Sequence, residues 1–122
     1  MTRIILWLVG LSYIINALLM WFHPHFWYET VPGITMMGPF NLHFIRDVGL
    51  GYLVAGAGLI YGIRNPGIAV FSAIWPAFHA IYHIFIFFDR GFPMDTVAAT
   101  NLLLIQIPAW ASLWVAWSRR WD

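Results

Sequence analysis

The chain lacks cysteine and lysine, and only 9% of its 122 residues are charged. The absence of cysteine excludes thiolate chemistry. All six basic residues are arginines, they form no basic run, and the formal net charge is +1, so nothing in the charge pattern indicates nucleic-acid binding. A soluble domain carries about 25% charged residues. The shortage of charge therefore argues against a soluble globular protein.

Hydrophobic residues make up 61% of the chain and gather in long runs. A membrane-spanning helix needs about 20 mostly apolar residues, and four segments meet this requirement: 3–22, 40–63, 67–88 and 95–118. The sequence predicts an all-α integral membrane protein, an antiparallel bundle of four transmembrane helices forming a single domain over 1–122. Asn65 and Asp95 are expected to be N-caps of the last two helices. No Ala-x-Ala site follows the first apolar run, so we expect it to be a retained span.

Arginine placement predicts the orientation of the bundle. With four spans, both termini and the turn after the second span share one side of the membrane, which carries Arg3, Arg64, Arg119 and Arg120. The opposite side carries two arginines offset by four acidic residues: Arg46 and Arg90 with Glu29, Asp47, Asp89 and Asp95. Positive residues favour the cytoplasmic side. We therefore expect both termini in the cytoplasm.

All five histidines fall in the half of the bundle away from the termini, and two pairs have helical spacing. His43 and Asp47 are four residues apart, as are His79 and His83 on the next span, so each pair shares a helix face. The first pair continues into a stripe of small residues: Gly51, Ala55, Gly58 and Gly62. Such stripes face neighbouring membrane helices. We therefore expect His43 and Asp47 to point inward with the stripe.

The leading interpretation of these pairs is a metal site with His43, Asp47, His79 and His83 as ligands. Four methionines on the same side favour copper, because a thioether is a soft ligand, with zinc or iron as alternatives: Met20, Met36, Met37 and Met94. The competing interpretation is a structural network. In that network His43, Asp47 and Arg46 pair with one another, and His79 and His83 bond to Thr100 or Asn101.

A cofactor or a small solute is an alternative ligand to a metal ion. Histidines from different helices could be the axial ligands of a haem, and a quinone or small acid could be held by histidine and Arg46. In these readings Arg46, Thr100 and Asn101 contribute to the binding site. The aromatic-rich segment 25–39 is expected to fold over the mouth of the bundle as a lid, from which Glu29 and His25 could close the site.

The last span carries tryptophans at helical spacing: Trp110, Trp114, Trp117 and Trp121. They predict an interfacial anchor or a packing face against a partner. A bundle this small leaves apolar faces available, so we expect contact with the lipid bilayer and a homo-oligomer or larger membrane complex. An accessory or structural subunit without a site of its own is therefore the alternative function. No stretch resembles a hydrolase or redox motif, and a transporter or small membrane enzyme ranks third.

The size, the four spans and the segments "FWYETVPG", "GPFNLHFIRDVGLGYL" and "FHAIYH" give the chain a family likeness. The chain resembles the small four-helix bacterial membrane proteins called DoxX-like. The resemblance covers the whole chain and implies a four-span fold in a bacterial inner membrane. It transfers no catalytic residue to this sequence.

Overall fold

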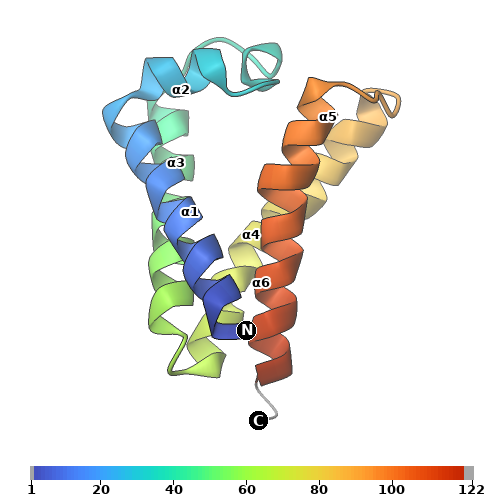
Figure 1. Cartoon of the computed structure of the whole chain (residues 1–122). Coiled ribbons are helices and arrows are strands. Elements are labelled where there is room, and N and C mark those ends of the chain that lie inside the picture. Colours follow the sequence, from blue (N-terminus) through green and yellow to red (C-terminus); the bar gives the residue numbers. More distant parts are fainter. Residues whose placement is uncertain (1, 120–122) are drawn as a thin grey trace.

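The structure, a computed structural model, describes residues 2–119. Its long helices are α1 (Thr2–Phe22), α3 (Leu42–Tyr61) and α4 (Pro66–Asp89). A fourth rod runs through α5 (Thr96–Thr100), the π-helical segment η2 (Asn101–Gln106) and α6 (Ile107–Ser118). The short helices α2 (Pro24–Thr30) and η1 (Ile34–Met36) lie between α1 and α3 (Figure 1). No strand occurs among the described residues.

The four long rods are each long and apolar enough to cross a membrane. Their bounds differ from the predicted ones by at most two residues at either end. Both predicted caps are present, since Asn65 Oδ1 accepts from the Ile68 N–H at 3.4 Å and Asp95 Oδ1 accepts from the Ala98 N–H at 2.9 Å. The prediction of an all-α bundle of four membrane-spanning helices is therefore confirmed.

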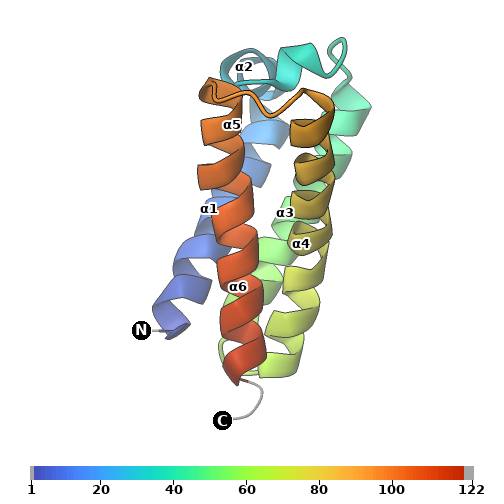
Figure 2. The same cartoon turned by 90° about the vertical axis from the view of Figure 1, so that its right-hand side faces the viewer.

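The rods form two pairs that diverge. Figure 1 shows α1 beside α3 on one side and α4 beside the α5–η2–α6 rod on the other, and the turned view in Figure 2 agrees. The pairs meet at the terminal end, where Thr2, Arg119 and the α3–α4 turn lie, and separate toward the distal end, which carries α2 and the α4–α5 turn. The predicted positions Arg120 and Trp121 lie outside the described residues.

Small residues hold the helices together at the terminal end. A Cβ added at Gly56 would lie 2.6 Å from the Gly10 carbonyl oxygen, so α1 and α3 touch along their backbones. A Cβ at Gly62 would lie 2.5 Å from the Ala69 nitrogen, and one at Gly58 would lie 2.0 Å from Ser72 Oγ. These contacts confirm that the predicted small-residue stripe of α3 faces a neighbouring helix, here α4.

The π-helical segment interrupts the fourth rod where it faces the upper half of α4. Pro108 follows this segment and has no N–H to donate to the preceding turn. The missing donor favours a local change in the helical hydrogen-bond pattern, here from α to π. The Gln106 side chain donates to the Ala80 carbonyl of α4 at 2.8 Å and to Asn101 Oδ1 at 3.1 Å. This side chain ties the rod to α4 at the height of the histidines.

Candidate functional site

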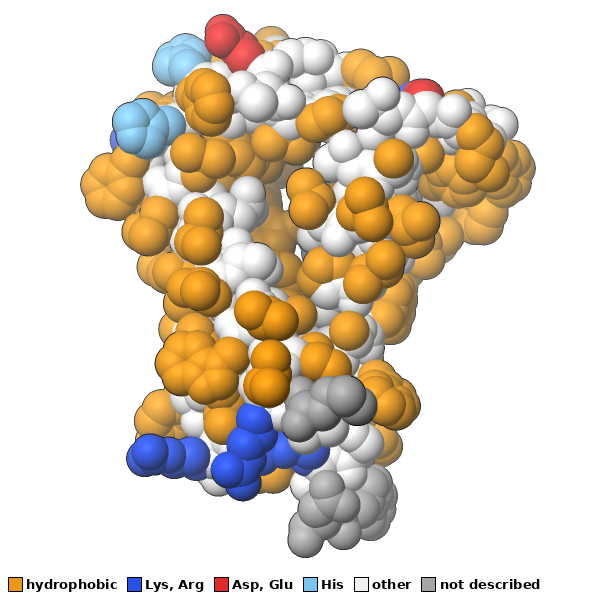
Figure 3. Space-filling model, viewed as in Figure 1, with side chains coloured by type: hydrophobic (Ala, Val, Ile, Leu, Met, Phe, Trp, Pro, Cys, Tyr) orange, Lys and Arg blue, Asp and Glu red, His pale blue; other side chains and the backbone are white. Residues whose placement is uncertain are grey.

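A cavity of about 600 Å³ fills the wedge between the two helix pairs. Its walls come from every long rod and from the lid, residues 25–39, which crosses the distal end (Figure 1). The space-filling view shows the surface hollowed between the pairs on the α1–α6 side (Figure 3). Most wall residues are apolar, among them Ile45, Val48, Ile86, Leu104 and Ile105. The predicted lid is therefore confirmed as a cover over a hollow.

Two histidines and a tyrosine form a connected polar cluster on this wall. The His79 and His83 ring centroids are 4.7 Å apart, and those of Tyr52 and His79 are 5.7 Å apart. Among the described residues, no hydrogen bond joins the side chains of Tyr52, His79 or His83 to another protein group. These three side chains, called the polar cluster below, therefore keep their donors and acceptors available to the cavity.

Several other polar groups of the wall already have partners. The Trp27 indole of the lid donates to Asn16 Oδ1 at 2.9 Å, and Asn16 Nδ2 donates to Met20 Sδ at 3.4 Å. The Tyr28 hydroxyl donates to the Gly38 carbonyl at 2.7 Å. Buried polar groups are normally paired within the protein. These hydrogen bonds therefore explain the presence of the three side chains without a ligand. The side chains of the polar cluster, by contrast, have no such partner among the described residues.

His43 and Asp47 lie elsewhere, on the exposed surface of α3. His43 Nδ1 and Asp47 Oδ2 are 2.9 Å apart, so the predicted pairing of the two is present, but the side chains are 85% and 62% exposed. Neither residue lines the cavity. The expectation that both point inward was therefore wrong. They occupy the first turns of α3 at the distal end, where the helix pairs have diverged and α4 no longer covers this face.

The three residues predicted to contact a cofactor, Arg46, Thr100 and Asn101, do not share one site. Arg46 lies over the Trp21 ring, 5.1 Å from its centroid, donates to the Trp21 carbonyl at 3.4 Å and does not line the cavity. Thr100 lines the wall, but its hydroxyl donates to the Thr96 carbonyl at 2.8 Å. Asn101 lines only the smaller neighbouring cavity.

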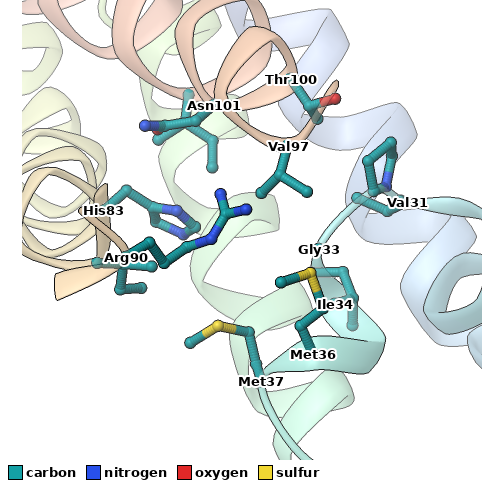
Figure 4. Close-up of a pocket in the computed structure, with 13 residues that line it drawn as sticks. Val31, Gly33, Ile34, Met36, Met37, His83, Arg90, Val97, Thr100 and Asn101 are labelled. Carbon is teal, nitrogen blue, oxygen red and sulfur yellow. The ribbon is translucent and has the colours of Figure 1, made fainter. Parts of the chain in front are cut away.

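That smaller cavity, about 70 Å³, lies between the lid and the α4–α5 turn and shares His83 with the large one. Figure 4 shows Val97 of α5 pointing toward Gly33 of the lid, while His83 and Arg90 point in from α4. A Cβ added at Gly33 would lie 2.7 Å from Val97 Cγ1, so only glycine allows this close approach. Glu29 and His25 are exposed and line neither cavity.

An ion pair fixes the turn beside this smaller cavity. The Arg90 guanidinium donates to both carboxylate oxygens of Asp95, with Nη1 3.5 Å from Oδ1. The hydrogen bond from Arg90, assisted by the Ala98 N–H, lowers the pKa of the Asp95 carboxyl from its ordinary value. The ion pair therefore holds the start of α5 against the end of α4.

The histidines and carboxylates near the cavity limit which metal ion or cofactor it could bind. No group of three or more His, Asp or Glu side chains within residues 2–119 is arranged to hold a metal ion, and His79 and His83 come from one helix. The cavity wall offers a haem no second histidine from a different helix. Metal binding by the four predicted residues, with copper favoured, stays a prediction.

The sequence analysis missed Tyr13 and Tyr52, which lie near the middle of their spans and form the inner end of the cavity with ring centroids 5.2 Å apart. A hydroxyl group within an apolar run was the sequence feature that could have identified them.

In comparisons with known proteins, no family model, curated protein or solved structure matches the chain. The resemblance to DoxX-like proteins therefore stays a prediction.

Proposed function

We propose that the chain is an integral membrane protein that binds a small organic molecule in the large cavity. The observation that carries the proposal is the polar cluster, three neighbouring side chains that line the cavity and have no hydrogen-bond partner within residues 2–119. Leaving such groups unpaired in an apolar setting is unfavourable. A ligand that hydrogen-bonds to them would remove that cost.

The size and lining of the cavity support the same conclusion. Sites for small molecules typically have volumes of about 300–1,000 Å³ and mostly apolar walls with a few polar groups that fix orientation. The cavity has a volume of about 600 Å³ and this kind of lining. The cavity lies beneath the lid in the distal half of the bundle, away from Arg3, Arg64 and Arg119. By the positive-inside rule we infer that this half of the bundle faces the non-cytoplasmic side.

Two phenylalanine substitutions on α3 test the proposal. Val48 lines the cavity, whereas Val54 is 71% exposed on the same helix. Protein purified in lipid nanodiscs is extracted and any retained small molecule is measured by mass spectrometry. We expect wild type and Val54→Phe to retain the same molecule and Val48→Phe to lose it. Equal retention by both variants, or no retained molecule in wild type, would contradict the proposal.

A metal ion is the second candidate, favoured by the short separation of two imidazoles that lack protein hydrogen-bond partners. Neutral imidazole is a common ligand for copper and zinc. Two protein ligands leave the remaining positions to water or to a bound molecule. Titration with copper or zinc, followed by elemental analysis after dialysis, should give one retained ion in wild type and none in His79→Ala. No retention by wild type would exclude this candidate.

A further inference from the structure

We infer that the ligand of the large cavity is an uncharged amphipathic molecule, whose hydrogen-bonding end is held by the polar cluster near the middle of the membrane. The inference rests on the proposed function and specifies its ligand class. Its starting point is the composition of the wall. Of the described residues that line the large cavity, none is an arginine, an aspartate or a glutamate.

The nearby charged side chains point elsewhere. Arg46 lies over the Trp21 ring, outside the cavity. Asp47 pairs with exposed His43 on the outer surface of α3. The Arg90 guanidinium lines only the smaller cavity, where it is paired with Asp95. An ionised ligand in the large cavity would therefore meet no opposite fixed charge on its wall.

The titratable side chains of the wall are tyrosines and histidines: Tyr13, Tyr28, Tyr52, Tyr82, His79 and His83. At about pH 8, above the range in which histidine titrates in water, these groups supply no counter-charge. Placing a charge near the centre of a span without a partner is costly. A neutral ligand avoids this cost.

The depth of the polar cluster determines how such a ligand lies. Tyr52 is near the middle of α3 and His79 is near the middle of α4, whereas Phe44 and Ile86 line the cavity closer to the distal end. The side chains of Tyr52 and His79 thus lie deeper in the cavity than these apolar residues, and His83 lies one helical turn nearer the distal end. A molecule that matches this pattern places a hydroxyl or carbonyl group at the inner end and its apolar body along the walls.

Three probes with the same alkyl chain separate charge from hydrogen bonding: 4-nonylphenol, 4-nonylbenzoate and nonylbenzene. Binding to protein in nanodiscs is measured at about pH 8, where the phenol is neutral and the benzoate is ionised. Protein-free nanodiscs correct for partitioning into lipid, and Val48→Phe corrects for binding outside the cavity. We expect the phenol to bind about 100-fold more tightly than the benzoate, because the benzoate carries an unpaired charge into the span. We expect it to bind about fivefold more tightly than nonylbenzene.

The variant Tyr52→Phe with His79→Phe identifies the groups that hold the polar end. This variant should bind phenol and nonylbenzene equally, while its circular dichroism shows that the helices remain. Benzoate binding as tight as phenol binding would overturn the inference but leave the proposed function standing. If none of the three probes binds wild type better than Val48→Phe, the proposed function fails and the inference fails with it.

Discussion

His79 stacks on Trp75, with ring centroids 5.1 Å apart and ring planes 9° apart. The two residues are four apart on α4, so the stack follows directly from helical spacing. Trp75 in turn lies against α3, since a Cβ added at Gly51 would be 2.7 Å from Trp75 Cζ2. One face of the imidazole is thus covered while the ring still lines the cavity. The glycine of α3 therefore sets the position of the histidine through the tryptophan.

Substituting Gly51 tests this relationship. In Gly51→Ala the new methyl group must displace Trp75, and His79 should lose its orientation toward the cavity. We expect about fivefold weaker binding of 4-nonylphenol, the loss of roughly one hydrogen bond. Gly67→Ala is the matched control, because its Cβ would meet only Asn65 Oδ1 at 3.4 Å. Unchanged affinity in a folded Gly51→Ala protein would show that the stack does not position His79.

The two histidine pairs should behave differently when they are removed. His43→Ala breaks an exposed pair with Asp47, which is outside the cavity. Such surface pairs contribute about 0–1 kcal/mol to stability. We expect no change in probe binding, whereas His79→Ala should weaken it about fivefold. Titration calorimetry of both variants checks this, and equal losses from the two would restore the predicted four-residue site.

The Arg90–Asp95 pair predicts a pH effect at the start of α5. Because the pKa of Asp95 is lowered in the folded protein, its stabilising effect is present above the ordinary carboxyl value of about 4 and is lost as pH falls through the lowered pKa. The protection factor of the Ala98 amide, which donates to Asp95, should therefore drop in acid. Asp95→Asn keeps an acceptor oxygen but should lack this pH dependence. Asp89→Asn, at the exposed end of α4, should retain it.

The contact between the lid and α5 can be tested by cross-linking in this cysteine-free chain. A Cβ at Gly33 would lie 3.6 Å from Val97 Cβ, and disulfides join Cβ atoms about 3.5–4.5 Å apart. We expect Gly33→Cys with Val97→Cys to form an intramolecular disulfide on mild oxidation. The positive φ of Gly33, 92°, will cost about 1–2 kcal/mol. Each single variant is the control for intermolecular bonding, and free thiols in the double variant would show that the lid is not seated on α5.

Local physical rules were enough to predict the spans and their caps. Apolar runs of membrane length define helices because each backbone group must be satisfied within its own segment. Asn65 and Asp95 are N-caps because their side-chain oxygens accept hydrogen bonds from backbone N–H groups three residues further on, and both hydrogen bonds are present. The small residues from Gly51 to Gly62 were also predicted correctly to face a neighbour, because alternating steps of four and three residues keep to one face of a helix.

The inward placement of His43 failed because that stripe was extended by two successive four-residue steps. Each such step advances the face by about 40°, so His43 is rotated about 80° from Gly51. The divergence of the helix pairs then leaves this face uncovered, and this divergence is a tertiary property. The π-helical segment before Pro108 was missed as well. A proline indicates that the helical hydrogen bonds before it are disturbed, but it does not indicate which hydrogen-bond pattern replaces them.

Photolabelling gives the most direct test of the central claim, that the cavity between the diverging helix pairs binds a ligand at the polar cluster. A diazirine-bearing alkylphenol is irradiated with the protein in nanodiscs, and the adducts are located by peptide mass spectrometry. The account predicts adducts around Tyr52 and His79 that excess 4-nonylphenol suppresses and that Val48→Phe prevents. Adducts confined to lipid-facing side chains such as Leu8 and Val54, and insensitive to competition, would contradict it.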